Sequence, residues 1–574
     1  MKKLLLLTLS VVFVSAVNAQ VIFSGESPAS IQGAYDMEYA TPGGGWGVPD
    51  LLDPANAVLD TLVQYFDGSP ADSLGCMVAT NSGDLQDQIA ILYRGDCQFG
   101  TKALNAQNAG AIACVIINNE PGAPVGMAPG NDGANVTIPL VMISDVGGET
   151  LLNEMQNGPV EVFIGNKTGF YPNDVGTNAG AVLRPEYAVT PALIAQDDTE
   201  YEVDLGAWVY NYGFQNQTNV NISAIIEYNG TEIYNDTATA VDIVASDSSY
   251  FTLPTFSQPT YSTGKYELTY TVGSDSSDAY SFDNTYTTTF HISDSLLTYA
   301  SLTDSSGLPS TSGGFRPGGT APTYSSCMAF RDENASRIAP EGITFSAIKG
   351  ADANFPSMEG EALLVIAYEW NDQFTDLNDQ NFGFTALEEI TFAEYTYPSD
   401  LSGQPVTGYF DDAFALEDNQ RYLFCVQTFN EDIFIGFDPE MDYTQNVNNY
   451  AQPICPVEAD GSYTALGFGA DRVSGVTVNV VDVAFVNLEE EALNIDMNAY
   501  PSPVRSTLNV DFSGHEVENI QLVSLAGRKV AEQSIHKGVE QTKVDVTNFD
   551  NGVYIVNVKL VNGLTKTMRV VVSH

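Results

Sequence analysis

Histidine supplies the base of most nucleophilic sites and two ligands of many peptidase zinc sites, so the histidines limit the chemistry open to this chain. The 574 residues include four, His291, His515, His536 and His574, and no His-Glu-x-x-His segment occurs. Three of them lie close to the C-terminus. Only His291, in the strand-like segment Thr-Thr-Thr-Phe-His-Ile-Ser, could serve the rest of the chain. A lone histidine in a strand is usually structural, so we predict no peptidase centre and no catalytic residue.

Carboxylates are abundant, with 73 Asp and Glu residues against 21 Lys and Arg. Two positioned carboxyl groups suffice for glycoside hydrolysis, and a carboxylate-based hydrolase therefore stays an alternative, although nothing marks a particular pair. The acidic groups Asp275-Asp278-Asp283 and Asp372-Asp376-Asp379 could offer oxygen ligands to Ca²⁺. Neither matches the EF-hand pattern. We therefore expect solvated loops and no cofactor, with Ca²⁺ as the alternative.

The formal net charge of −52 excludes phosphate-rich partners. From Leu493 onward, 8 Lys and Arg residues balance 8 Asp and Glu residues, so the acidic excess belongs to the preceding chain. Such a charge repels nucleic acid and anionic surfaces. We expect an acidic, solvated surface on folded domains, because aromatic residues make up 11% of the chain.

Six cysteines allow 15 pairings if all are bonded. We predict a disulfide between Cys76 and Cys97 and a second between Cys425 and Cys455. Cys114 stands in the apolar run Ala-Cys-Val-Ile-Ile and is expected to be a buried thiol. Cys327 stays unassigned.

A strand, a helix and a second strand are predicted between residues 89 and 117. Ile89 to Tyr93 is nearly all apolar, as a buried strand requires, and Ile112 to Ile117 repeats the pattern. Between them, Phe99 and small residues recur at helical spacing until Gly110, which ends the helix. A helix that joins two strands is the crossover that parallel pairing needs.

These residues resemble the protease-associated (PA) domain, in which a strand, Arg-Gly-x-Cys-x-Phe, a helix and a strand follow in order. The match is carried by Arg94, Gly95, Cys97, Phe99, Lys102 and Gly110, and by the later Ile138-Pro139 and Ile143-Ser144. The resemblance implies a non-catalytic domain that recognises protein or peptide. A spacer without a ligand is the alternative.

Short segments with alternating apolar residues follow, including Tyr266, Leu268, Tyr270 and Val272. Together with Asn211-Tyr212-Gly213 and Gly264-Lys265-Tyr266, they resemble an immunoglobulin-like (Ig-like) sandwich of the CARDB (cell-adhesion-related) type. The β-rich sequence of residues 296–491 predicts a further, jelly-roll-like β-domain. Tyr368 and Trp370 could form an aromatic platform for glycans there. Leu364, Ile366, Tyr368 and Trp370 share one face of a strand, however, which favours a stripe of buried core residues. Glycan binding is therefore the alternative function.

The end of the chain reads Ala-Tyr-Pro-Ser-Pro, then Ala-Gly-Arg-Lys, then Asn-Gly-Val-Tyr. Period-two alternation in these segments predicts a small β-sandwich. Its motif residues Pro501, Pro503, Gly527, Arg528, Gly552 and Tyr554 resemble the type A C-terminal sorting domain of the type IX secretion system. Ser502 replaces the usual Asn. The resemblance implies contact with the secretion machinery, followed by release or by attachment to outer-membrane lipopolysaccharide.

The start of the chain has the pattern of a secretory signal peptide. Lys2 and Lys3 precede an apolar run from Leu4 to Val14 and the small residues of Val17-Asn18-Ala19. That run is too short to span a membrane as a helix, and we expect a soluble mature chain. The route would lead through the periplasm to the medium or the outer-membrane surface.

We therefore predict a mainly β multidomain protein. The expected order is a signal peptide (1–19), an α/β PA domain (20–186), an Ig-like β-sandwich (187–295), a jelly-roll-like β-domain (296–491) and a small sorting β-sandwich (492–574). The expected function is non-catalytic recognition of protein or peptide, with no nucleic-acid partner.

Overall fold

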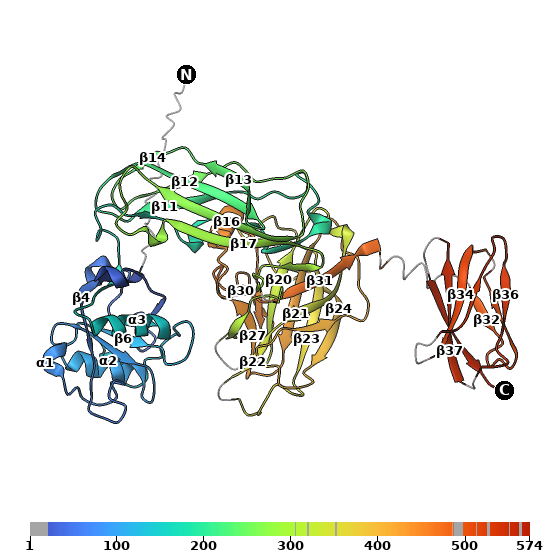
Figure 1. The fold of residues 1–574 in the computed structure, drawn as a ribbon, viewed down its shortest axis with the longest axis horizontal. Helices are drawn as coiled ribbons and strands as arrows, with labels where there is room; N and C mark the ends of the chain where they lie inside the picture. The colour runs from blue at the N-terminus through green and yellow to red at the C-terminus, as the bar shows by residue number, and fades with distance from the viewer. Residues whose placement is uncertain are drawn as a thin grey trace, which may run out of the picture.

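The computed structural model describes residues 21–304, 306–317, 321–350, 353–484, 486, 497–512, 514–524, 529–549, 552–561 and 565–574. The predicted signal peptide lies outside these residues. Figure 1 shows the chain passing from an α/β domain through β-rich domains, and the order confirms a mainly β multidomain protein. Within the described residues, no helix is both long and apolar enough to span a membrane.

The first domain is built on an eight-stranded sheet with the order β2-β1-β8-β4-β5-β6-β7-β3. Its centre is parallel and consists of β4 (Val58–Gln64), β5 (Ile89–Tyr93), β6 (Ala113–Ile117) and β7 (Leu140–Ile143). The helices α2 (Phe99–Asn108) and α3 (Asp145–Met155) follow β5 and β7. Burial of β5, β6 and β7 on both faces explains why their sequences are almost wholly apolar.

Gly110 ends the crossover helix as predicted. Its φ of +96° is a conformation that suits glycine, and a Cβ there would come within 2.4 Å of Gln86 Oε1. The chain then turns directly into β6, which lies parallel to β5 with Ile89 opposite Ala113. The sequence therefore predicted this strand–helix–strand unit correctly.

The remaining strands of the first domain are antiparallel and enclose the parallel centre. They are β1 (Val21–Ser27), β2 (Gly33–Ala34), β3 (Met37–Tyr39) and β8 (Glu161–Asn166). β3 pairs with β7 at one edge, while β8 joins β1 to β4 at the other. The domain thus ends with β8.

The Ig-like sandwich has two facing sheets. One contains β9 (Val175–Gly176), β11 (Gly206–Asn211) and β15 (Ser248–Thr252). The other contains β12 (Gln217–Tyr228), β13 (Thr231–Thr237), β14 (Val241–Ile243), β16 (Gly264–Gly273) and β17 (Thr285–Ser293). The predicted alternation is present, because Tyr266, Leu268, Tyr270 and Val272 are all buried in the sandwich core.

Residues 167–186, which the sequence assigned to the first domain, belong structurally to the sandwich. β9 pairs with β11, with Val175 opposite Asn211, and Val175 and Val182 are buried in the sandwich core. A two-residue strand carries no periodicity of its own. This explains why the sequence pattern did not reveal where the sandwich begins.

One sheet continues from the sandwich into the next β-domain. β10 (Val189–Pro191) pairs in parallel with β17 of the sandwich and antiparallel with β18 (Leu296–Thr298). β18 then pairs with β31 (Thr477–Asp482), which pairs with β21 (Ile338–Phe345), and β25 (Val406–Tyr409) forms the edge. The ten-stranded sheet therefore unites the two domains through backbone hydrogen bonds.

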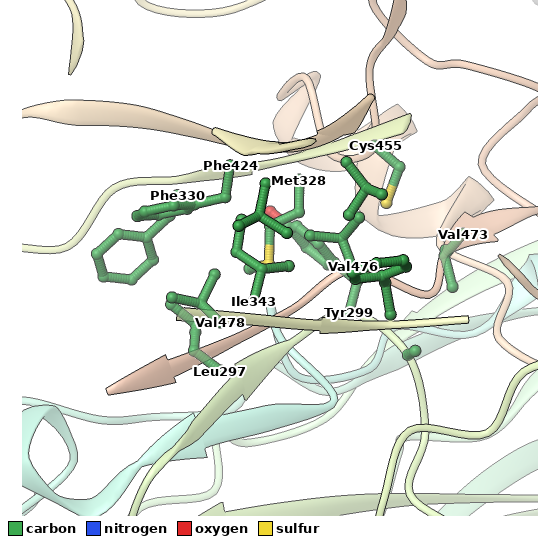
Figure 2. Close-up of a cluster of buried hydrophobic side chains, with 14 of the residues drawn as sticks. Leu297, Tyr299, Met328, Phe330, Ile343, Phe424, Cys455, Val473, Val476 and Val478 are labelled. Atoms are coloured by element: carbon green, nitrogen blue, oxygen red, sulfur yellow. The ribbon is translucent and has the colours of Figure 1, made fainter. Parts of the chain in front are cut away.

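The second β-domain stacks this sheet against a six-stranded one, as the predicted jelly-roll-like packing requires. The six-stranded sheet comprises β24 (Leu387–Thr396), β23 (Ala362–Trp370), β26 (Arg421–Thr428), β20 (Tyr324–Phe330), β28 (Val457–Ala459) and β29 (Ser462–Thr464). Four short strands, β19 (Ser312–Phe315), β22 (Ala347–Lys349), β27 (Ile433–Asp438) and β30 (Val473–Ser474), form a third sheet. Figure 2 shows Leu297, Tyr299, Phe330 and Val478 among the side chains that fill the core between strands.

The C-terminal domain is a small sandwich of two antiparallel sheets, as predicted. The first contains β32 (Asn498–Tyr500), β33 (Thr507–Asp511) and β36 (Gln541–Asp545). The second contains β34 (Val517–Ser524), β35 (Lys529–Ser534), β37 (Gly552–Leu560) and β38 (Thr565–Val572). Leu508, Val510, Val556 and Val558 are buried between them.

A buried ion pair fixes the start of the sandwich, directly after the last strand of the first domain. Lys167, directly after β8, places its Nζ 2.7 Å from Asp174 Oδ1 and 2.6 Å from Asp283 Oδ2. The ammonium also lies 4.3 Å from the ring centroids of Tyr212 and Tyr280. Burial raises the pKa values of both carboxyl groups, whereas Lys167 opposes the shift. This one cation therefore makes two buried carboxylates tolerable.

Replacing Lys167 with Ala should destabilise the protein strongly, because Asp174 and Asp283 would stay buried without a cation. The loss from breaking such a pair is about 3–5 kcal/mol, measurable by denaturant unfolding of the sandwich. Lys265→Ala is the matched control, since Lys265 makes an exposed ion pair with Asp304. That change should cost less than about 1 kcal/mol. Equal losses in the two variants would contradict a special role for Lys167.

Candidate functional site

Three of the PA motif residues, Arg94, Gly95 and Cys97, follow β5 at the carboxyl ends of the parallel strands. In open α/β sheets this edge is the usual place for a ligand. Arg94 follows β5 and Asn118 follows β6, and the Arg94 Nη1 donates a hydrogen bond of 2.9 Å to Asn118 Oδ1. The Asn118 Nδ2 in turn donates to the carbonyl of Ala123 at 3.0 Å. Arg94 thus organises the loop after β6 rather than standing free at the edge.

A disulfide fastens a second loop to the same edge. Cys76 and Cys97 are bonded at 2.03 Å, the pair that the sequence favoured. Gly95, between Arg94 and this cysteine, has a φ of +134°, and a Cβ there would meet Leu74 Cδ2 at 3.3 Å. The glycine therefore allows the loop that contains Leu74 to lie close against the motif.

Lys102 holds this loop from the helix α2. Its side chain is buried in α2, and its Nζ donates to the carbonyl of Leu74 and lies 3.7 Å from Cys76 Sγ. Burial lowers the pKa of this lysine to about 8. Lys102 is thus a structural residue whose amine holds the disulfide loop, and it does not face a ligand.

Asp67 fixes the beginning of the same loop, and the sequence motifs did not reveal it. Its carboxylate accepts hydrogen bonds from the backbone N–H groups of Ser69, Cys76 and Met77 at 3.0, 3.1 and 3.2 Å. Burial opposes the charged form, but these hydrogen bonds outweigh it and lower the pKa of Asp67. The turn-forming segment Asp-Gly-Ser-Pro at 67–70 is the signal that could have indicated this role.

The fastened loop presents apolar side chains to solvent. Met77 is 60% exposed and Val78 is 79% exposed, directly after the disulfide-bonded Cys76. Three attachments therefore hold an exposed apolar pair beside the Arg94 edge: the disulfide, Lys102 and Asp67. We refer to Met77, Val78 and their supporting loop 67–80 as the apolar loop.

The other two PA motif residues define the helix rather than the edge. Phe99 begins α2 and packs partly buried against the core, while Gly110 lies just beyond the end of the helix. The segment from Met127 to Val136 packs on α2, because a Cβ at Gly100 would meet the carbonyl of Pro129 at 2.1 Å. An open hollow of about 620 Å³ lies elsewhere on this domain, between Tyr93 and α3. Gln64 and Asn153 also line it.

The second disulfide differs from the prediction. Cys327 and Cys425 lie directly opposite each other on β20 and β26, with Cα atoms 4.1 Å apart, and are bonded. The predicted bridge between Cys425 and Cys455 is therefore wrong. Cys455 is an unbonded thiol buried in the core on the other face of that sheet, and Figure 2 shows it among the side chains of this core. Cys114 is also an unbonded buried thiol.

Trp370 is not available as a glycan platform. Its ring is fully buried and stacks on Phe384 with centroids 4.5 Å apart, and its Nε1 donates to the carbonyl of Gly383 at 3.0 Å. Tyr368 is partly buried against the same cluster. Ile366 and Trp370 are buried, as the core-stripe interpretation expects, but Leu364 and Tyr368 are only partly buried. The main core receives Leu363, Val365 and Ala367 from the opposite face of the strand. The glycan alternative loses the residues that suggested it.

The acidic groups named as Ca²⁺ candidates are used within the fold. Asp283 pairs with Lys167, Asp278 accepts from the backbone N–H groups of Val175 and Tyr280, and Asp372 pairs with Arg421. In the part of the chain that the structure describes, no three His, Cys, Asp or Glu side chains are grouped to hold a metal. His291 lies in β17, where burial lowers its pKa.

The described sorting-motif residues lie at the start of the C-terminal sandwich and in its strand β37. Pro501 and Pro503 lie between β32 and β33, and the Ser502 Oγ accepts a hydrogen bond of 3.0 Å from the N–H of Val571 in β38. Gly552 begins β37 and Tyr554 is buried within it. Gly527 and Arg528 lie outside the described residues. Ser502 thus links the opening of the domain to its last strand.

Two family models match the chain. The PA domain model covers residues 58–151, and the secretion-system C-terminal sorting domain model covers residues 498–573. The chain therefore contains both domains and is an exported protein that reaches the cell surface or the medium through type IX secretion. The PA model includes β4 to β7 and the apolar loop.

Curated relatives share only a small part of their length with this chain. Aminopeptidase YwaD of Bacillus subtilis is 34% identical over 124 residues, which cover 19% of this chain and 27% of that protein. The human ER degradation-enhancing alpha-mannosidase-like protein 3 is 33% identical over 110 residues, 18% of this chain and 12% of that protein.

Two of the solved structures that are similar to this chain match about a quarter of it each. An aminopeptidase from Aneurinibacillus sp. is 21% identical, with a TM-score of 0.19 over 26% of this chain and 31% of that chain. The CARDB domain of a Pyrococcus furiosus protein is 16% identical, with a TM-score of 0.16 over 22% of this chain and 98% of that domain.

Peptide mapping under non-reducing conditions should recover the pairs Cys76–Cys97 and Cys327–Cys425. Cys114 and Cys455 should not react with iodoacetamide in the native protein, because both are buried and burial raises each thiol pKa to about 12. After unfolding in guanidinium, both should be alkylated. Recovery of a peptide that joins Cys425 to Cys455 would contradict the structure.

Proposed function

We propose that this exported protein recognises protein or peptide through the apolar loop and the Arg94 edge of its PA domain, without catalysis. The observation that carries the proposal is the exposure of Met77 and Val78 on a loop that is held in place at three points. Exposed apolar side chains on a rigid support favour binding, because little conformational entropy is lost when a partner covers them. A loop that served only as a spacer would not need this support.

The chemistry of the ligand follows from the surface and the overall charge. Burying an apolar side chain of this size contributes about 1.5–3 kcal/mol, so peptides with apolar side chains should gain most. The net charge of −52 attracts basic chains over long distances and repels acidic ones. We therefore expect apolar peptides with basic flanking residues, bound faster at low salt than at high salt.

The non-catalytic part of the proposal is supported by the residues beside this edge. Arg94 is engaged by Asn118, and Lys102 by the carbonyl of Leu74. Each is therefore used to hold a loop. The similarity to aminopeptidases covers less than a third of each protein named above, so it supports a shared domain and does not by itself bring their activity to this chain.

The double substitution Met77→Asp and Val78→Asp should abolish most peptide binding while leaving the fold intact. The change places two charges on an exposed apolar surface, and we expect affinity for peptides captured from an array to fall at least about tenfold. Fluorescence anisotropy with the mature chain would measure it.

Leu59→Asp is the matched control, because Leu59 is an exposed apolar residue on β4 at the opposite end of the parallel strands. It should bind peptides as the unmodified chain does. Unchanged binding by the Met77 and Val78 variant, or equal losses in both variants, would refute the assignment of this loop.

A further inference from the structure

A deep pocket lies where the sandwich meets the second β-domain, far along the chain from the PA edge. Its volume is about 430 Å³, which is suitable for a small organic molecule. It is lined by residues 184–187 before β10, residues 202–204 before β11, the ends of β20 and β26, and residues 443–454, which include α4 (Thr444–Tyr450). Both domains that share the ten-stranded sheet thus contribute to the walls.

Arginines are concentrated in this pocket although cations are scarce in the chain. Arg184, Arg331 and Arg421 line it, three of only 21 Lys and Arg residues in 574. Arg184 is 2% exposed and Arg421 is 5% exposed, whereas Arg331 is exposed at the surface. Arginine presents N–H donors in a planar arrangement that matches a carboxylate.

The two buried guanidinium groups are incompletely bonded. Arg421 donates from Nε to Asp372 and from Nη1 to Gln452 Oε1 at 3.1 Å, but its Nη2 has no partner among the described residues. Arg184 donates from Nη2 to Tyr286 OH at 2.6 Å, while its Nε has no partner there. A buried donor without an acceptor costs about 1–3 kcal/mol, so both groups would gain from an additional acceptor beside them.

The rest of the wall is aromatic and acidic. Tyr299 packs between Tyr187 and Tyr443, with ring centroids 4.9 and 5.3 Å away. Glu186 also lines the pocket, together with Glu202 and Asp204. Aromatic rings beside arginine donors favour a ligand that has both a ring or apolar body and an anionic group.

The geometry points to binding of a small organic ligand that carries a carboxylate group, held by the Arg421 side chain and the exposed Arg331, with its body against the tyrosines. Two sources share this chemistry: an amino acid or peptide C-terminus with an aromatic side chain, and a uronic acid sugar. This site is separate from the apolar loop and does not depend on peptide binding there.

Glu186 should make binding depend on pH. Glu186 is an exposed residue at the pocket wall, where the surrounding protein and then Asp332 raise the pKa of its carboxyl group to about 7 against the opposing effects of Tyr187 and Arg421. The other charged groups of the pocket are Arg184, Arg331, Glu202 and Asp204. Below this pKa Glu186 is neutral, and above it the carboxylate repels an anionic ligand, so affinity should fall as the pH rises through about 7.

The test is isothermal titration of the full mature chain with N-acetyl-L-tyrosine and with glucuronate, each compared with its uncharged counterpart, N-acetyl-L-tyrosine amide or glucose. At least one acid should bind about tenfold more tightly than its counterpart, and the tighter acid identifies the source. Equal binding of acid and counterpart in both pairs, or no binding of either acid, would overturn the proposal.

Variants separate the pocket from a general charge effect. Arg421→Lys and Arg331→Gln should weaken binding of the acid, whereas Arg472→Gln, in the same domain but outside the pocket, should not. Glu186→Gln should remove the decline in affinity between about pH 6 and pH 8. If Arg421→Lys fails to fold, the other two variants test the site. Unchanged affinity for the acid in Arg331→Gln, together with an unchanged pH profile of affinity in Glu186→Gln, would refute it.

Discussion

The backbone pairing of β10 is the constraint on which the middle of this molecule depends. Three residues, Val189–Pro191, lie between β17 of the sandwich and β18 of the second β-domain and are buried. Without this strand the ten-stranded sheet would be two sheets with exposed edges, which favour association with other chains. The arginine-lined pocket lies where this pairing brings the two domains together.

Scarce cations are placed where parts of the fold meet. Lys102 holds the apolar loop to α2, Lys167 fixes the start of the sandwich directly after the PA domain, and Arg184 lies between the sandwich and the second β-domain. Each is buried, although lysine and arginine are rarely buried unless paired. In a chain with an excess of carboxylates, a buried cation is a specific connector, because few other cations compete for the same partners.

The sequence predicted local structure well and long-range pairing poorly, for a physical reason. The alternation from Tyr266 to Val272 and the apolar run of β5 record which faces are buried, so strands and the crossover helix could be recognised. The partner of Cys425 depends on the register between β20 and β26, which are 98 residues apart at the disulfide. The motif residues Arg94 and Lys102 were found. Asn118, the partner of Arg94, and Asp67, which holds the apolar loop together with Lys102, were not found. The pocket was also missed, because its walls come from segments far apart in sequence.

The position of β31 has a consequence for the order in which the protein is made and exported. β31 pairs with both β18 and β21, so it completes the shared sheet, and it is followed by the sorting domain at 498–573. During synthesis, β31 is therefore made before the sorting domain. A nascent chain that is cut short ahead of β31 lacks the sorting domain as well, and so a polypeptide unable to complete its fold also has no C-terminal signal by which the secretion system could select it.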